Sequence, residues 1–161
     1  MTATDTASST STGGTSQSVE SAVTDLIRVF KRPAVQRRLM EDAGVAIEFG
    51  AYWALGRVAA LGPCRPSELA ASLGVDASTI THRIQALERS GLVERSTDPT
   101  DGRACNVHLS EAGTGALTRL REARRALFDQ LLEGWSPDEQ SRFAAAAERL
   151  RIALEREIRE P

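Results

Sequence analysis

The sequence predicts a mainly α-helical protein with one small two-stranded sheet. Long stretches repeat apolar side chains at helical spacing, and Ala, Leu, Arg and Glu, which favour helix, are abundant. Only residues 92–109 combine alternating apolar positions with the turn residues of a β-hairpin. The length of 161 residues fits a single domain or a small domain with extensions.

The overall composition is that of an ordinary globular protein, with 41% hydrophobic and 26% charged residues. No apolar run approaches the roughly 20 residues of a membrane helix, and no secretory signal is apparent, so we expect a cytoplasmic protein. The formal net charge is −2, and Lys31 is the only lysine. Arginine suits bidentate contacts with phosphate and guanine, but the base composition of the source genome is the simpler explanation for its use.

The first 44 residues divide into a tail and two helices. Residues 1–18 are almost entirely Thr, Ser, Ala and Gly, so they bury too little apolar area to offset their ordering entropy, and we expect a disordered tail. A helical period appears from Val19 and is interrupted at Pro33, which begins a second helix that ends near Gly44.

The middle of the chain has the spacing of two helices around a tight turn. A helix is predicted from Val45 to Leu61, and a shorter one from Ser67 to Leu73. Gly74 is placed to adopt a left-handed conformation, and Asp76 is placed to cap a further helix over residues 77–89.

The helix at residues 77–89 has one apolar and one polar face. We expect Ile80, Ile84 and Leu87 to face the core. Short polar groups and long hydrogen-bond donors occupy the remaining positions: Ser78, Thr79, Thr81, His82, Gln85 and Arg89. This arrangement suits a helix whose first turns reach base edges in the major groove of DNA, although an ordinary solvated face has the same pattern.

A hairpin is predicted next, with strands at residues 92–95 and 106–109. Val107 and Leu109 should point inward, and Asn106 and His108 outward. The connection is longer than a tight hairpin needs and carries an arginine, Arg103, that can enter a narrow minor groove, with Asp101 holding the guanidinium extended. Residues 45–110 are therefore predicted to form a winged helix-turn-helix.

Residues 111–161 are predicted to form two long helices. Ser110 should cap the first, and Ser136 and Glu139 should form a capping box at the start of the second. Their apolar positions exceed what a small winged domain can cover: Leu117, Leu120, Leu127, Leu131, Leu132, Phe143, Ala147, Leu150, Ile152, Leu154 and Ile158. A symmetric homodimer is the economical solution.

Five motifs between Ser67 and Gly113 together resemble the MarR family of winged helix-turn-helix regulators. In order they are ELA-x-x-LG, STIT, LE-x-x-GLV-x-R, DP-x-DGR and LS-x-x-G, and a looser match extends over residues 19–160. The resemblance implies dimerisation helices at residues 19–44 and 111–161. It also implies a homodimer on a pseudo-palindromic DNA operator, usually a repressor, often released by a small aromatic or phenolic ligand.

The resemblance also implies the residues that contact DNA: Ser78, Thr79, Thr81, His82, Gln85 and Arg103, with Asp101 orienting Arg103. Where many family members have Arg, this chain has His82, which still offers a donor but attracts phosphate less. Tyr52, Trp53 and Arg57 are the candidates for a ligand pocket, although such aromatics more often fill a core or an interface.

Other functions find less support in the sequence. The acidic net charge and His82 motivate one alternative, a winged-helix module that senses a ligand or binds a protein without binding DNA. We expect no enzymatic activity, because the sequence has no phosphate loop, no nucleophile elbow and no carboxylate pair set in a plausible cleft. We also expect no cofactor and no membrane partner. A zinc site fails on spacing, because no close ligand pair exists among Cys64, Cys105, His82 and His108. We interpret Cys105 as a small buried side chain, and neither cysteine lies in the N-terminal helices, where some family members sense oxidants.

Overall fold

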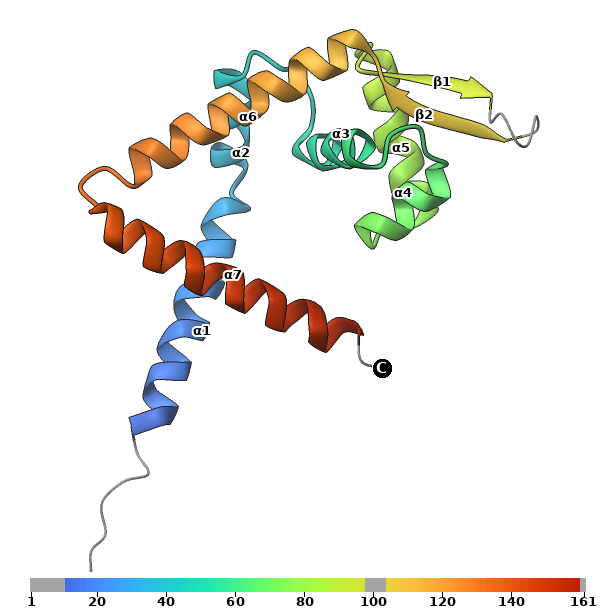
Figure 1. Cartoon of the computed structure of the whole chain (residues 1–161). Coiled ribbons are helices and arrows are strands. Elements are labelled where there is room, and N and C mark those ends of the chain that lie inside the picture. Colours follow the sequence, from blue (N-terminus) through green and yellow to red (C-terminus); the bar gives the residue numbers. More distant parts are fainter. Residues whose placement is uncertain (1–10, 98–103, 160–161) are drawn as a thin grey trace, which may run out of the picture. The chain divides into compact units, whose positions relative to one another are not determined.

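The computed structural model of the chain describes residues 11–97 and 104–159. Its elements are α1 (Ser11–Phe30), α2 (Pro33–Asp42), α3 (Phe49–Leu61), α4 (Pro66–Leu73), α5 (Ala77–Arg89), β1 (Val93–Thr97), β2 (Cys105–Leu109), α6 (Glu111–Leu131) and α7 (Pro137–Arg159) (Figure 1). The predicted mainly helical fold with a small hairpin is confirmed. The chain divides into two compact units between Arg121 and Glu122, within α6.

Three helices and the hairpin form the centre of the first unit. Helices α3, α4 and α5 contact one another, α5 also contacts β1, and both α3 and α4 contact β2. The largest fully buried side chains come from these elements and from α6: Leu55, Val58, Leu69, Ile80, Ile84, Leu87, Val107 and Leu120. The predicted inward stripe of α5 is therefore confirmed, and each such side chain contributes about 1.5–3 kcal/mol through burial.

The turn between α4 and α5 has the predicted chemistry. Gly74 adopts φ +61°, a left-handed conformation that costs glycine little. Two residues later the Asp76 carboxylate accepts a hydrogen bond of 2.8 Å from the Thr79 amide, so Asp76 is the N-cap of α5.

The hairpin is antiparallel, with Val93 opposite Leu109 and Thr97 opposite Cys105. The other edge of β2 is also paired, because Cys64 and Val107 exchange backbone hydrogen bonds of 2.9 and 3.1 Å. Val107 is buried, as predicted, whereas Leu109 is only half-buried.

Two expectations for β2 are wrong. Asn106 is buried, with an exposed fraction of 9%, instead of pointing outward. The physical reason is that β2 is covered along its second edge by the segment at Cys64 and by α3 and α4, so the strand does not have one dry and one wet face. Cys105, expected to be buried, is half-buried near the end of the hairpin.

Ser110 joins the hairpin to α6 as the predicted N-cap. Its hydroxyl donates to the Gly91 carbonyl at 2.6 Å and accepts from the Gly113 amide at 2.9 Å. Its own amide donates to the Leu92 carbonyl at 3.2 Å. Gly113 packs so closely that a Cβ atom at this position would lie 1.9 Å from the Leu92 oxygen.

Two helices begin elsewhere than expected. Helix α1 begins at Ser11, so residues 11–18, expected to belong to a disordered tail, are helical. Extending an existing helix adds one hydrogen bond per residue and avoids the cost of nucleation, so a polar stretch can continue it. Helix α3 begins at Phe49 instead of Val45, because Gly44 turns left-handed at φ +61° and the Val45 amide closes α2 by bonding to the Met40 carbonyl.

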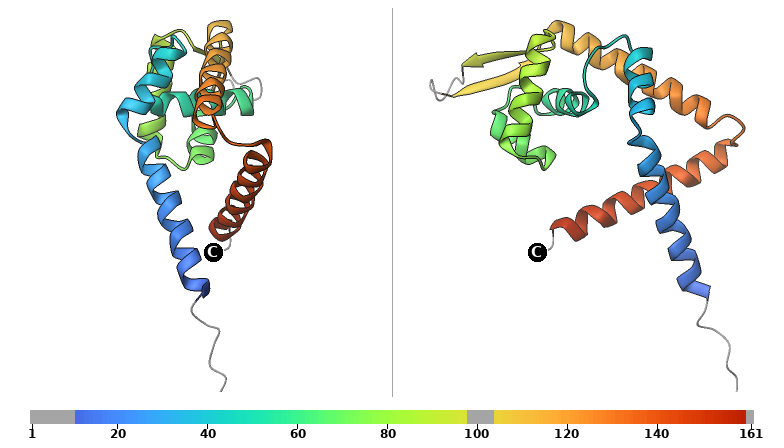
Figure 2. Two further views of the ribbon diagram at one scale, coloured as in Figure 1. Left: turned by 90° about the vertical axis from the view of Figure 1, so that its left-hand side faces the viewer. Right: turned by 180° about the vertical axis from the view of Figure 1, so that it is seen from behind.

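The second unit contains the end of α6 and the continuous helix α7 (Figure 2). The predicted capping box is confirmed: the Ser136 amide donates to the Glu139 carboxylate at 2.8 Å, and the Glu139 amide donates to the Ser136 hydroxyl at 3.3 Å. Every residue of α7 from 137 to 158 is exposed. Within the described ranges, no helix has both the length and the apolar character needed to cross a membrane.

Replacing Gly113 with Ala should destabilise the protein by about 1–3 kcal/mol or more, because the added methyl group overlaps the Leu92 carbonyl. Chemical denaturation followed by circular dichroism measures this loss. Gly115→Ala is the matched control on the same helix, since its Cβ would meet only the Arg119 side chain at 3.6 Å. The control should be neutral or stabilising, by about 0.5–1 kcal/mol. Equal effects of the two changes would contradict the close contact.

Candidate DNA-binding surface

Helix α5 presents a polar face opposite its buried stripe. Ser78, Thr81, His82 and Gln85 are exposed, and Thr79 is half-buried at the border of this face. The 100° turn per residue places the four exposed side chains on one side of the helix. The structure thus brings the five residues predicted on α5 together within its first three turns.

The two residues predicted at the tip of the wing, Asp101 and Arg103, lie outside the described residues. The structure describes the strands on either side, β1 and β2, as far as Thr97 and Cys105. A contact of Arg103 with DNA, and its orientation by Asp101, therefore stay predictions.

Asp76 collects three donors at the start of α5. Its Oδ1 accepts from the Ser78 hydroxyl at 2.5 Å and from the Thr79 amide at 2.8 Å, and its Oδ2 accepts from the Thr79 hydroxyl at 2.7 Å. These bonds, that from Ser78 foremost, hold the pKa of the Asp76 carboxyl far below its usual range. Because the folded pKa is lowered, the stabilisation is present above the ordinary carboxyl pKa and is lost as the pH falls through the folded value.

The remaining polar side chains of α5 differ in their freedom to bind a partner. The Thr81 hydroxyl donates to the Ala77 carbonyl of its own helix at 2.7 Å. The structure shows no intramolecular hydrogen bond from the side chains of His82 or Gln85 to any residue it describes. These two long donors are thus available to an external partner.

A bidentate ion pair connects α5 with the wing. Arg95 of β1 donates through Nε and Nη2 to the two carboxylate oxygens of Glu88, at 2.6 and 3.1 Å. This hydrogen bonding raises the pKa of Arg95. Sequence reasoning did not assign the pair a role, although its signal was present: both residues belong to LE-x-x-GLV-x-R, seven positions apart. The pair fixes the direction of β1 relative to α5.

The charges around α5 balance. Residues 65–97 contain four arginines and four acidic residues, so this segment carries no net charge with His82 neutral. The net electrostatic attraction of this segment to phosphate is correspondingly weak, so hydrogen bonds would have to contribute more of any affinity for DNA.

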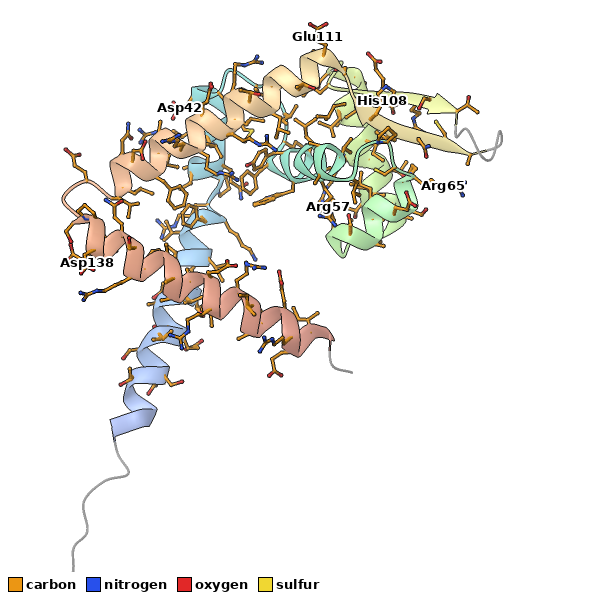
Figure 3. The ribbon with its side chains drawn as sticks, viewed as in Figure 1. Asp42, Arg57, Arg65, His108, Glu111 and Asp138 are labelled. Carbon is orange, nitrogen blue, oxygen red and sulfur yellow. The ribbon has the colours of Figure 1, made fainter. Side chains whose placement is uncertain are left out.

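The three residues predicted to bind a ligand lie on α3 in different environments. Tyr52 is buried, and Trp53 is 51% exposed. Arg57, which is labelled in Figure 3, is half-buried. The Tyr52 and Trp53 rings contact each other and the ring of Phe49, with centroids 5.3–5.8 Å apart. The Arg57 Nε atom is buried without a hydrogen-bond partner among the described residues.

A pocket of about 830 Å³ lies beside this cluster, between α2 and the start of α3. Met40, Val45, Ile47 and Phe49 give it apolar walls, and the polar side chains along it are Gln36, Arg37, Glu41 and Glu48. None of Tyr52, Trp53 and Arg57 lines it; Phe49 provides the link between them. Sequence reasoning missed this pocket because it placed the break between the helices at Gly44 alone and expected helix at residues 45–48, which the structure shows to be non-helical.

The histidines and cysteines do not gather. His108 faces Glu94 across the hairpin, with Nε2 3.7 Å from the carboxylate (Figure 3). Cys64 is buried, and this burial raises the pKa of its thiol. In the part of the chain that the structure describes, no three His, Cys, Asp or Glu residues are grouped to hold a metal ion.

Comparison with known proteins agrees with this geometry. The model of the MarR family matches residues 52–105. YxaD of Bacillus subtilis (strain 168), named as an uncharacterized HTH-type transcriptional regulator, is 31% identical over 128 residues, which cover 80% of this chain and 90% of that protein.

Two solved structures show the same fold. A probable transcriptional regulator from Pseudomonas aeruginosa is 33% identical, with a TM-score of 0.59 over 71% of this chain and 86% of its own. FabT of Streptococcus pneumoniae, solved in complex with DNA, is 19% identical, with a TM-score of 0.67 over 86% of this chain and 96% of its own. With the capped helix α5 and the hairpin beside it, these likenesses show that the chain is a transcriptional regulator of the MarR family.

Proposed function

We propose that this protein is a homodimeric, sequence-specific DNA-binding repressor in which α5 enters the major groove. The observation that carries the proposal is the exposed polar face of α5, where His82 and Gln85 extend donors that no described residue uses. Gln suits bidentate recognition of adenine, and the first turns of a recognition helix are those that reach base edges. FabT, which shares the fold, was solved in complex with DNA, and this supports DNA binding as the function.

Replacing His82 or Gln85 with Ala should weaken binding to the preferred DNA about 5- to 100-fold, because each change removes a base-edge contact. The preferred sequence is obtained by selection from a random DNA pool, and affinities are measured by gel shift at several salt concentrations. Ser90→Ala is the control, since Ser90 lies at the far end of α5 and bonds only to the Ala86 carbonyl.

Two outcomes of this experiment would contradict the proposal. If no sequence is enriched from the pool, or if both α5 variants bind as tightly as the Ser90 control, α5 is not a recognition helix. Either result would favour the alternative of a winged-helix module that senses a ligand or binds a protein.

The proposed dimer rests on apolar surface that the single chain leaves in water. Helix α7 places Phe143, Ala147, Leu150 and Leu154 at the four- and three-residue spacing of a helical seam, and Leu154 is 60% exposed. Helix α1 likewise exposes large apolar side chains: Val19, Leu26, Ile27 and Val29. A helix with this much exposed apolar surface requires a partner, and a second copy supplies the same surface. The two recognition helices would then lie about 34–36 Å apart on a pseudo-palindromic operator.

Leu150→Asp should convert the dimer to a monomer, because it introduces a charge into the apolar seam. Sedimentation at micromolar protein concentration measures the change. Ile152→Asp is the matched control: this neighbour is also exposed but points about 160° away from Leu150 on the helix. A wild-type monomer, or equal dissociation by both variants, would contradict a dimer held by this seam.

We propose that the pocket beside α2 and Phe49 binds the effector and that binding releases DNA. Its apolar walls accept a ring, and the guanidinium of Arg37 provides a charge for a carboxylate. The sequence candidates Tyr52 and Trp53 would act through their contact with Phe49.

The effector proposal can be tested with benzoate, 2-hydroxybenzoate and phenol as probes. In a Trp135→Phe variant Trp53 is the only tryptophan, so a ligand that contacts Phe49 should change its fluorescence. The same probe should release DNA in a gel shift, and Arg37→Ala should weaken the response to the two carboxylates but not to phenol. Fluorescence changes without release of DNA would contradict a regulatory role.

A further inference from the structure

We propose that Asp76 fixes the hydrogen-bond polarity of Ser78, so that this hydroxyl faces DNA as an acceptor and reads a base amino group. This inference rests on the proposed function, in which α5 lies in the major groove. It assigns Asp76 as a positioning residue and Ser78 as a specificity-determining residue.

Asp76 accepts hydrogen bonds from the donors at the start of α5. A hydroxyl has one hydrogen and two lone pairs. The hydrogen of Ser78 is directed to Asp76 Oδ1, and that of Thr79 to Asp76 Oδ2 at 2.7 Å. The Thr79 amide also donates to this carboxylate, at 2.8 Å. One side chain, Asp76, thus accepts from both hydroxyls and from the Thr79 amide at this helix end.

The hydrogens of Ser78 and Thr79 remain directed at the Asp76 carboxylate. An ionised carboxylate is acceptor-only, and hydrogen bonds to it are about twice as strong as neutral ones. An aspartate is ionised in neutral solution, and its three hydrogen bonds lower the pKa of the Asp76 carboxyl further. A DNA phosphate that used these three donors would have to displace Asp76 while approaching its negative charge. The carboxylate therefore opposes the usual attraction of phosphate to a helix N-terminus.

The Ser78 hydroxyl oxygen retains lone pairs on its outer, exposed side. This side chain is exposed, on the same face as His82 and Gln85. Its free lone pairs can accept only from a donor. In the major groove the donors are the N6 amino group of adenine and the N4 amino group of cytosine, whereas guanine O6 and thymine O4 are acceptors.

The test compares wild type with Ser78→Ala and Asp76→Asn on the DNA selected from a random pool. The base pair read by Ser78 is the one at which discrimination disappears in Ser78→Ala. At that pair, an analogue without the amino group is used: purine for adenine, or 2-pyrimidinone for cytosine. Loss of the amino group should weaken DNA binding by the wild-type protein about 2- to 10-fold and should not change binding by the Ser78→Ala variant.

Asp76→Asn keeps the N-cap, since asparagine caps as well as aspartate. Asp76 Oδ1 accepts from both the Thr79 amide and the Ser78 hydroxyl, so an asparagine that keeps the cap places its NH2 group at the Thr79 hydroxyl and keeps the Ser78 hydrogen bond as a weaker, neutral one. The Ser78 hydrogen is then held less firmly, and sensitivity to the base amino group should decrease in Asp76→Asn. Asp76→Asn also removes a negative charge, which should raise the affinity for all DNA sequences equally. Comparing DNAs with and without the amino group within this one variant cancels that uniform gain. Thermal unfolding of each variant shows that α5 is intact.

Three outcomes would overturn the inference. The first is that Ser78→Ala leaves selectivity at every base pair unchanged. The second is that it weakens binding to all sequences equally and reduces the salt dependence, which indicates a phosphate contact. The third is that removal of a base carbonyl, and not of the amino group, weakens wild-type binding. If selection succeeds and depends on His82 and Gln85, these results refute only the polarity of Ser78. If nothing is selected, the proposed function itself fails.

Discussion

The contact of Gly113 with the Leu92 carbonyl is the constraint on which the arrangement of the winged domain depends. Helix α5 ends just before Gly91, and α6 begins just after β2, so this contact closes the path of the chain around the hairpin. Ser110 reinforces it by bonding to both Gly91 and Gly113. Helix α6 is thereby joined to the end of α5 through backbone contacts that leave no room for a side chain.

Local signals made most of the fold predictable. Caps such as Asp76 and Ser110, and the left-handed Gly74, act over a few residues, so the pattern of the sequence contains them. Burial of Asn106 was not predictable, because it depends on a pairing between Cys64 and Val107, which are 43 positions apart. The pocket beside α2 was missed for a related reason: it exists only because residues 45–48 do not continue a helix.

The candidate site was predictable as a face but not as a set of hydrogen bonds. Helical period alone placed Ser78, His82 and Gln85 on the side of α5 opposite its buried stripe. Which atoms of that face donate and which accept depends on the orientation of the Asp76 carboxylate, which periodicity does not contain. Arg103 and Asp101 remain predictions from the sequence.

The ion pair between Glu88 and Arg95 has a consequence for how such a protein can be regulated. Two parallel hydrogen bonds hold β1 to α5 and oppose a change in the angle between the helix and the base of the hairpin. In the proposed dimer, an effector would therefore act by changing the separation or the tilt of two intact winged domains, each of which would keep its preference for a half-site.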